Sequence, residues 1–595
     1  MAPGLVVAHP QAAEQIANYR VKLLPQAKTN LQYAGVESGT VNQTGRFSPD
    51  GAAYPWISGR YGNCTGAGPC FDYEYHLGGD IGLELYNYYT VTGDTDFFKQ
   101  ELFPIYDAIA QFYADALTYN QTIDKYELLN ATDPDEYANF ERNVGYTMVL
   151  MKTHIETANT LRTRLGMTAN STWATIASKI IVPVYNPANI ILEYATMNNT
   201  VQVKQADVVL IDDFLNFPNN QSLSDLDYYA GKQSNNGPGL TYGVFSVVAN
   251  EISPSGCSSY TYDIEGSAPY IRGPWFQFSE QLTDDYNTNG GTHPAFPFLT
   301  GHGGANRVAV FGYLGLKLML DSFNVNPSLP PQITDLTYRT IYWQGHPIKA
   351  ASNQTHTTLT RPALTPSLPN ANATFATAAI PITIGVPGES QFGNTTTYHL
   401  LPNTTLTLSN RRIGSIKTVP GNIAQCQPAT SPQDYLPGQF PFAAVDGAVS
   451  TRWQPSQSNI SSSLTVSLPG PFVPITAVEF DWAQAPPQSY SVTFSNSSSG
   501  AVVNVTSSSS VAISAAYNAA TAYEIVAYSS NTTNVTLGTP VWSGEFATLT
   551  IRGNRALEGT ADAGNGTGAT VAEFVLVAAG GGNVVARRGV KAWVA

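Results

Sequence analysis

The sequence predicts a mainly α-helical body followed by β-sandwich modules, and three features of the 595-residue chain support this. Up to about residue 322, apolar residues recur at helical spacing, most clearly in 12–24, 81–89, 97–119, 144–165, 206–215 and 307–320. After about residue 326, Pro-rich turns separate short alternating strands such as 381–386 and 405–408. Beyond about residue 420, further strands are predicted at 464–468, 477–482, 489–494, 523–528 and 574–577. A chain of this length is expected to form two or three folded units.

The composition predicts a secreted or vacuolar glycoprotein. Charged residues make up only 12% of the chain, and the acceptor pattern Asn-X-Ser/Thr occurs about seventeen times. The net charge of −14 argues against a nucleic-acid partner, which requires a basic face. The sequence contains no run of 18 or more apolar residues, so no membrane-spanning helix is predicted. The start, Met1–Leu5, lacks the pattern of a signal peptide, so we expect a chain truncated at its N-terminus.

The four cysteines fit an oxidising route. Cys64 and Cys70 enclose a short polar loop, where a disulfide would remove loop entropy. Cys257 and Cys426 are then left either as a long-range pair or as free thiols. No Cys/His cluster has the spacing of a zinc site, and no metal or other cofactor is expected.

Two carboxylates in aromatic settings predict cleavage of a glycosidic bond, which uses one carboxylic acid and one carboxylate. Glu136 follows Asp133-Pro134-Asp135, and we expect it to be the proton donor, with its pKa raised by Tyr137, Phe140 and the neighbouring aspartates. Glu280 ends the segment Pro274-Trp275-Phe276-Gln277-Phe278-Ser279-Glu280 and would be the general base. The simpler alternatives are a solvent-exposed loop Glu at 136 and a carboxylate at a helix N-terminus at 280.

Five motifs in one order resemble glycoside hydrolase family 65, and within it the acid trehalases of fungi. They are Tyr54-Pro55-Trp56, Tyr75-His76-Leu77-Gly78-Gly79-Asp80-Ile81, Asp133-Pro134-Asp135-Glu136-Tyr137, Lys204-Gln205-Ala206-Asp207-Val208 and Thr300-Gly301-His302-Gly303-Gly304. The resemblance covers about residues 1–415. It implies an (α/α)6 barrel, incomplete at its N-terminus, and an inverting hydrolase that cleaves α,α-trehalose without a cofactor.

The resemblance also implies residue roles. Glu136 matches the general acid of the family, and Glu280 matches the base of its hydrolase members. Lys204 and Gln205 match residues that hold sugar hydroxyls, and Trp56 matches a wall of the glucose subsite. Without the resemblance, Trp56 reads as a core aromatic and Lys204 as a solvated cation at a helix start. His76 and Asp80 are expected to shape the site, the alternative being a helix cap.

The C-terminal part carries a second resemblance. Residues 443–453, Ala-Ala-Val-Asp-Gly-Ala-Val-Ser-Thr-Arg-Trp, resemble the start of a discoidin-type (F5/8 type C) β-sandwich. Such a module would either bind cell-wall or surface glycans or act as a spacer that stabilises the catalytic body. Asp446 and Arg452 would then be a structural pair. The expected domains are a partial catalytic barrel at 1–325, a small β domain at 326–418 and the discoidin-like module at 421–595.

Two other functions remain open at this point. One is hydrolysis or phosphorolysis of another α-glucosyl disaccharide such as kojibiose. The other is an inactive, truncated protein that only binds glycans through its C-terminal module. The expected location is secreted, cell-wall associated or vacuolar. The sequence leaves the preferred α-glucoside, the glycan occupancy and the oligomeric state undecided.

Overall fold

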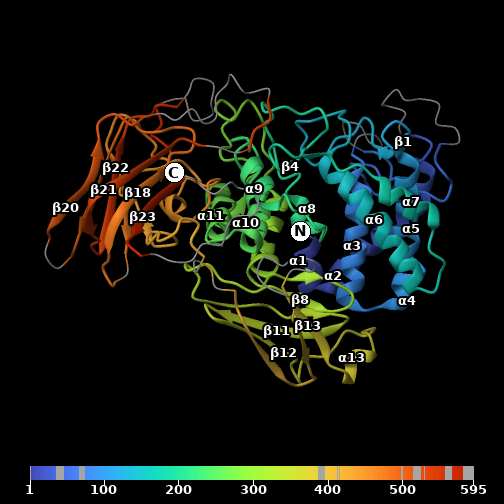
Figure 1. Cartoon of the computed structure of the whole chain (residues 1–595). Coiled ribbons are helices and arrows are strands. Elements are labelled where there is room, and N and C mark those ends of the chain that lie inside the picture. Colours follow the sequence, from blue (N-terminus) through green and yellow to red (C-terminus); the bar gives the residue numbers. More distant parts are fainter. Residues whose placement is uncertain are drawn as a thin grey trace.

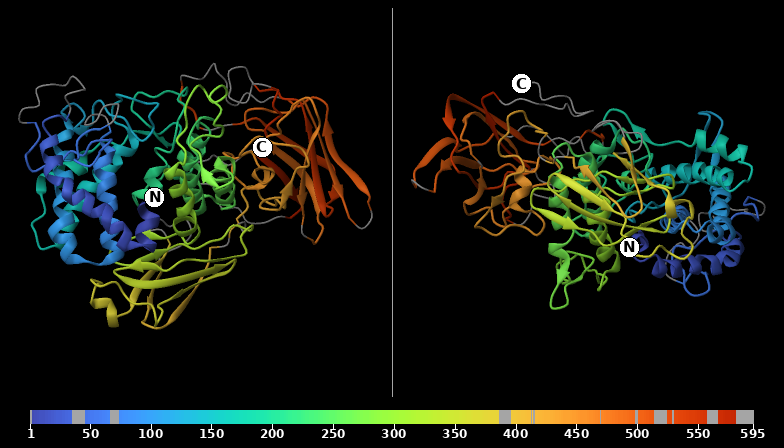
Figure 2. Two further views of the ribbon diagram at one scale, coloured as in Figure 1. Left: turned by 180° about the vertical axis from the view of Figure 1, so that it is seen from behind. Right: turned by 90° about the horizontal axis from the view of Figure 1, so that it is seen from below.

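The computed structural model describes residues 2–34, 46–65, 74–385, 396–411, 413, 416–468, 470–497, 500–512, 524–527, 530–556 and 566–580. Figure 1 shows three parts: a helical body in blue to green, a yellow β region against its lower side, and an orange to red β-sandwich beside the green helices. The two views of Figure 2 agree that the sandwich adjoins the green helices and lies away from the blue ones.

The helical body contains two groups of packed helices. The first comprises α1 (Ala2–Ala8), α2 (Pro10–Asn30), α3 (His76–Thr92), α4 (Thr95–Phe97), the π-helix η1 (Phe98–Leu102), α5 (Phe103–Ala116), α6 (Gly145–Arg164) and α7 (Ser171–Lys179). The second comprises α8 (Leu210–Phe214), α9 (Ser222–Ala230), α10 (Leu240–Ile252), α11 (Ser258–Glu265), the 3-10 helix η2 (Ala268–Tyr270), α12 (Leu299–Arg307) and the π-helix η3 (Val308–Tyr313). α3 packs against α2, α5 and α6, and α10 packs against α9, α11 and α12.

Short hairpins connect these helices. They are β1 (Thr118–Asn120) with β2 (Lys125–Glu127), β3 (Val184–Tyr185) with β4 (Ile190–Ile191), and β5 (Ile271–Arg272) with β6 (Gln277–Phe278), each pair antiparallel. The hairpins β1–β2 and β5–β6 precede the loops that carry the two predicted catalytic carboxylates. The connections between helices therefore supply the candidate site.

The predicted helices are present, but their limits differ. The helix expected through residue 320 ends at Tyr313, because Gly315 adopts a φ of +62° and lies against the backbone of Asn326, where a side chain would clash. Lys317–Leu318 is then a strand, β7. Within the helical body, α1, α7, α9, α10, α11 and α12 were not predicted. α10 reads LTYGVFSVVANEI, whose β-branched and small polar residues favour no helix on their own.

The β region consists of two sheets that share one core with the helical body. Its elements are β7, β8 (Phe323–Val325), β9 (Asp335–Thr337), β10 (Ile341–Trp343), β11 (His346–Asn353), β12 (His356–Thr360), α13 (Thr374–Thr377), β13 (Ile380–Ile384), β14 (Thr396–Leu400) and β15 (Thr405–Ser409). Among the described strands the orders are β10-β11-β12-β15, with β9 beside β11, and β14-β13-β8-β7. The N–H groups of Gln344 and Gly345 donate to the carbonyls of Thr90 and Val91 at the end of α3. The β region is therefore hydrogen-bonded to the C-terminal end of α3 in the helical body.

The C-terminal part is a β-sandwich. Its described elements are β16 (Ala429–Thr430), the 3-10 helix η4 (Pro441–Val445), β17 (Ser462–Ser467), β18 (Pro474–Asp481), β19 (Ser489–Ser495), β20 (Val502–Ser508), β21 (Thr532–Trp542), β22 (Phe546–Arg552) and β23 (Glu573–Ala578). The sheets run β16-β17-β22-β19-β20 and β21-β18-β23. Phe480 stacks on Trp482 and Phe574 in the core between them. Of the strand expected at 523–528, residues 524–527 are not in a strand, while Tyr523 and Tyr528 lie outside the described residues.

The sandwich docks on the helical body through the discoidin-like segment. The buried carboxylate of Asp446 accepts hydrogen bonds from the hydroxyls of Thr261 in α11 and of Thr451. Ser450 donates to Asp227 in α9 over 2.8 Å. A disulfide joins Cys257, just before α11, to Cys426. At these residues, the discoidin-like segment therefore contacts the helical body and is not free to bind a ligand.

The long-range cysteine pair is therefore present, and Cys257 and Cys426 are not free thiols. Cys64 is also disulfide-bonded, but Cys70, its expected partner, lies outside the described residues. Within the described part of the chain, no helix combines the length and the apolar character required to cross a bilayer.

Candidate active site

The loop that carries Glu136 is closed by backbone pairing and anchored by its two aspartates. It connects β2 to α6, and Ala131 and Glu141 exchange two backbone hydrogen bonds of 2.7 and 2.8 Å across its base. The carboxylate of Asp133 accepts from the N–H groups of Tyr146 and Thr147 in the first turn of α6, at 3.0 and 3.1 Å. Asp133 therefore caps this helix from the loop, where a negative charge is favoured.

Asp135 ties the same loop to a second segment. Its carboxylate accepts from the N–H of Lys204 at 2.9 Å and from that of Tyr137 at 3.2 Å, and its own N–H donates to Asp207 at 3.0 Å. The side-chain amide of Gln205 donates to the carbonyl of Pro134. Glu136 is thus presented from a backbone that is fixed on both sides.

Glu136 forms an ion pair with Lys204. Burial lowers the pKa of Lys204, but the hydrogen bond to Glu136, the charge of Glu136 and then that of Glu280 outweigh it, so the pKa is raised. Lys204 therefore stays cationic and lies within electrostatic reach of both predicted catalytic carboxylates. The structure pairs Lys204 with Glu136, and the charge of Glu280 acts on the same Lys204.

The expected aromatic enclosure of Glu136 is wrong. Tyr137 and Phe140 are 49% and 55% exposed, and the side chain of Glu136 itself is 36% exposed. Phe140 has a φ of +63°, within the turn that closes the loop. The loop turns these rings outward because its interior is occupied by the carboxyls of Asp133 and Asp135. The Glu136 carboxylate accepts a hydrogen bond from Lys204.

Glu280 follows β6 on a segment held from both sides: the N–H of Ser279 donates to the carbonyl of Tyr270, and Arg272 donates to the carbonyls of Gln281 and Leu282. Its carboxylate accepts from the N–H of Ala295 at 2.8 Å, and its own N–H donates to the carbonyl of the same residue at 3.1 Å. The expected alternative, a helix N-terminus, is not formed, because residues 280–286 form no helix. Trp275 and Phe276, which precede it, are 80% and 73% exposed.

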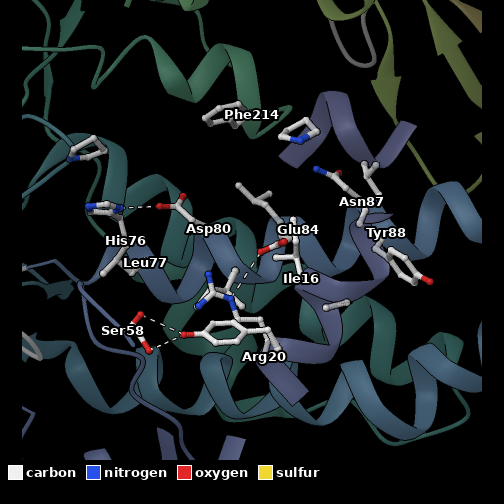
Figure 3. A pocket seen from close by; sticks show the side chains of 18 of the residues that line it. Ile16, Arg20, Ser58, His76, Leu77, Asp80, Glu84, Asn87, Tyr88 and Phe214 are labelled. Carbon is white, nitrogen blue, oxygen red and sulfur yellow. Dashed lines mark hydrogen bonds and ion pairs between the residues drawn. The ribbon is translucent and has the colours of Figure 1, made fainter. Parts of the chain in front are cut away.

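A cavity of about 550 Å³ opens in the helical body beside this loop. Its described lining comes from α1, α2, α3, α6 and α8 and from two loops, and it includes Trp56 and Pro134. Figure 3 shows the polar wall on α3, where His76 faces Asp80 one turn on, and Arg20 of α2 pointing at Glu84 over 3.9 Å. The volume lies in the usual range for small-molecule sites.

His76 and Asp80 form the core of that polar wall. The two ring nitrogens of His76 lie 2.7 Å from the carboxylates of Asp80 and Glu74, and Tyr146 donates to the other oxygen of Asp80 over 2.7 Å. Burial lowers the pKa of His76, but its hydrogen bonds and charge interactions with the two carboxylates raise it to about 10. His76 is therefore cationic. Neither residue caps α3, since the helix has no side-chain cap, so they shape the cavity wall.

The predicted site residues fall into two adjoining groups. Trp56 lines the cavity, whereas Glu136, Lys204, Gln205 and Glu280 are absent from its described lining. Pro134 connects the groups, because it lines the cavity and lies two residues before Glu136. The sequence did not indicate Glu193, Tyr146 or the role of Asp207. No local sequence pattern marks a buried carboxyl group, although Asp207 lies within one of the five motifs.

The fold has a counterpart among solved structures. A putative kojibiose phosphorylase from the human microbiome matches with a TM-score of 0.50 and 15% identity, over 69% of this chain and 53% of that one. The helical body accordingly has the (α/α)6-barrel architecture that was predicted, followed by β-rich parts. The matches to protein-family models define the class of the chain as the glycoside hydrolases.

The sequence places the chain within that class. Residues 1–197 match the glycosyl hydrolase family 65 central catalytic domain, and residues 318–369 match the C-terminal domain of the same family. The chain is 49% identical to the cell wall acid trehalase of Arthroderma benhamiae and 46% identical to the acid trehalase of Emericella nidulans, each over 97% of its length. The chain belongs to glycoside hydrolase family 65. It spans about half the length of these curated relatives, 56% and 55%.

Proposed function

We propose that the protein hydrolyses α,α-trehalose to glucose with inversion, with Glu136 as general acid and Glu280 as general base. The proposal is supported by the ion pair between Lys204 and Glu136 on the anchored loop, together with the charge of Glu280, which favours the cationic form of the same Lys204. An inverting mechanism requires two carboxyl groups with room for a water between them. The names of the two fungal relatives support trehalose as the substrate.

Each catalytic step has a candidate group. Glu136 protonates the departing glycosidic oxygen while the carboxylate of Glu280 removes a proton from the attacking water. In this proposal Lys204 donates to a sugar hydroxyl, and the ring face of Trp56 packs on the apolar side of glucose. Gln205 is already bonded to Pro134, so we assign it to holding the loop as well as to contacting substrate. The chemistry needs no metal or other cofactor.

The test is hydrolysis by the purified chain at acidic pH, with and without phosphate, on trehalose and on kojibiose. Release of glucose from trehalose without phosphate is expected. Glu280→Gln should abolish this hydrolysis, and azide should restore turnover by acting as an external nucleophile that needs no base. Full water-dependent activity in Glu280→Gln would remove Glu280 from the mechanism.

A second candidate is a protein that binds glycans without turnover. It is favoured if the chain binds cell-wall glycans while trehalose stays intact. For the C-terminal sandwich itself, the contacts of Asp446 and Ser450 with the catalytic body favour the stabilising role over glycan binding. Deleting residues 421–595 should then lower the unfolding temperature of the remaining body, and an unchanged temperature would favour an independent module.

The domain limits and the location are proposals of the same kind. We propose the three domains expected from the sequence, 1–325, 326–418 and 421–595, with one change. The middle domain starts near residue 317, because β7 and β8 pair within its sheet. The trehalases that the chain resembles include one named for the cell wall, so an extracellular, cell-wall location is proposed. Fractionation of cells with an antibody to the chain tests it against a vacuolar location.

A further inference from the structure

Behind the Glu136 loop lies a group of four buried carboxyls. Asp133, Asp135, Glu193 and Asp207 are each at most 2% exposed. Glu193 follows β4, and its carbonyl accepts from the N–H of Gly145, the first residue of α6. Asp207 lies between Lys204 and α8. Four side chains from three chain segments thus meet where loop, helix and sugar-binding motif join.

The hydrogen bonds divide the four into two kinds. Asp133 and Asp135 each accept from backbone N–H groups, as ionised carboxylates do. In contrast, both oxygens of Glu193, one oxygen of Asp207 and one of Asp135 have no N–H or O–H donor among the described residues. The side chains that these oxygens meet are other carboxyls: Glu193 meets Asp135, and Asp207 meets Asp133.

Two carboxyl oxygens form a hydrogen bond only when one of them carries a proton, and two buried carboxylates in contact repel each other strongly. Burial, together with the charges of its carboxyl neighbours, raises the pKa of Glu193 well above its usual range, and the same holds for Asp207. Asp133, which has the backbone donors, is raised only to about 6 by its burial. The donors are therefore Glu193 and Asp207.

We propose that Glu193 and Asp207 are positioning residues that act as neutral carboxylic acids, each donating a hydrogen bond to one of the two aspartates that hold the Glu136 loop. Their role rests on the proposed function of Glu136. The charged and titratable groups that face the four carboxyls are His76, Tyr113, Tyr146, Tyr194, Lys204 and Tyr229. Of these, His76 and Lys204 stabilise the ionised pair, Asp133 and Asp135, and none supplies a proton to Glu193 or Asp207.

An amide scan tests which carboxyls are neutral. In Asp207→Asn the amide keeps one oxygen to accept from the N–H of Asp135 and offers an N–H to Asp133, and Glu193→Gln likewise offers an N–H to Asp135. Both variants should fold and keep kcat within about threefold at acidic pH, whereas Asp133→Asn and Asp135→Asn turn amide groups toward backbone donors and should lose folding or kcat. Failure of both isosteric variants to fold at any pH overturns the proposal, since each replaces a neutral group by a neutral group.

The positioning role predicts a separate kinetic pattern. Glu193→Leu and Asp207→Leu should lower kcat by about 10²-fold with little change in KM, because the acid is misplaced while the sugar contacts remain. The isosteric amides should restore kcat. Equal loss in the leucine and amide variants would overturn the hydrogen-bond donor role.

The pH dependence of stability tests the same point without substrate. Glu193 and Asp207 hold their protons in the folded state above the ordinary values of 4.5 and 3.8, at which the unfolded chain loses them. The free energy of unfolding therefore falls as pH rises above about 4, and each amide variant should reduce that slope by one proton. Glu265→Gln, at a buried carboxyl whose pKa is about 8 because of burial, is the matched control: it should change the slope but not kcat. An unchanged slope in both site variants contradicts the proposal, and because no substrate is used this outcome is separate from failure of the proposed activity.

Discussion

The loop that carries Glu136 is anchored by buried carboxyls, whereas the segment that carries Glu280 lies among exposed aromatic side chains. Asp133 and Asp135 are buried and accept hydrogen bonds from α6, from Lys204 and from Tyr137 of the loop itself, while Trp275, Phe276 and Phe296 are 80%, 73% and 52% exposed. Among the described residues, the carboxylate of Glu280 accepts one hydrogen bond, from the N–H of Ala295.

The first region fixes the position of the Glu136 carboxyl group, and the second exposes aromatic surface beside Glu280. A proton donor must lie within hydrogen-bond reach of the leaving oxygen, so a loop fixed by several charged hydrogen bonds suits Glu136. The exposed rings beside Glu280 add little to folding and are available to contact a sugar. Changes in the first region should alter both stability and turnover, whereas changes at the exposed rings of the second should alter turnover alone.

The largest effect is expected at Glu136. Glu136→Gln should lower kcat by roughly 10²- to 10⁴-fold, because the amide cannot donate a proton to the leaving group. The measurement is the initial rate of glucose release from trehalose. Glu141→Gln, in the same loop but paired with Thr196, is the control and should retain the wild-type rate. Similar rates in both variants would show that Glu136 is not the acid.

Next comes the anchor of the loop. Asp133→Asn should reduce the free energy of unfolding by about 3 kcal/mol, since the buried amide faces the N–H groups of Tyr146 and Thr147. Urea unfolding followed by tryptophan fluorescence gives the value. A loss below about 0.5 kcal/mol, the range of ordinary surface changes, would mean that the loop is not anchored there.

The stabilisation by His76 is expected to depend on pH. Its pKa is raised from 6.5 to about 10 by Asp80 and Glu74, which outweigh burial. The stabilisation by His76 is therefore complete below about pH 6.5 and is lost as pH rises toward 10. His76→Gln should be less stable than the wild type at pH 6, and the gap should close at pH 10. A gap independent of pH would contradict a cationic His76.

A smaller effect is expected at Lys204. Lys204→Met keeps the length of the side chain but removes the charge, and it should raise KM for trehalose by about tenfold through loss of a hydrogen bond to the sugar. Lys152→Met, in a helical ion pair elsewhere, is the control and should leave KM unchanged. Equal KM values in the wild type and Lys204→Met would restrict Lys204 to holding Glu136.

The smallest effect on stability is expected at the exposed rings. Trp275→Ala should change the free energy of unfolding by less than about 0.5 kcal/mol, because the indole is 80% exposed. Trp173→Ala, at a ring that is 3% exposed in the core, should cost about 4 kcal/mol by the same denaturation assay. A large loss of unfolding free energy in Trp275→Ala would show that this exposed ring stabilises the fold.

Much of the fold was predictable because its helices carry apolar stripes, as in residues 12–24 of α2 or in α5. α10 was not, since its buried sequence has apolar and small residues on every face and only tertiary packing selects a helix. The end of the helix before Gly315 was equally hidden, because it depends on the backbone of Asn326, which approaches from a later turn.

The candidate site was predictable as motifs but not as contacts. The loop at 133–137 and the pair at 204–205 were both identified, yet their link through Asp135 joins residues that are 69 positions apart. The neutral state of Glu193 depends on carboxyls from two other segments, and no local pattern indicates it. Tyr137 and Phe140 were assigned to an enclosure that needs the chain to turn inward, and the buried aspartates turn it outward.

Inverting hydrolysis of trehalose is tested by the anomers of the first glucose released. Proton NMR of trehalose hydrolysis, recorded before mutarotation, should show α-glucose and β-glucose forming in equal amounts, because water inverts one ring while the other leaves unchanged. Formation of α-glucose alone would contradict the account by showing retention. So would intact trehalose at every acidic pH with the folded chain.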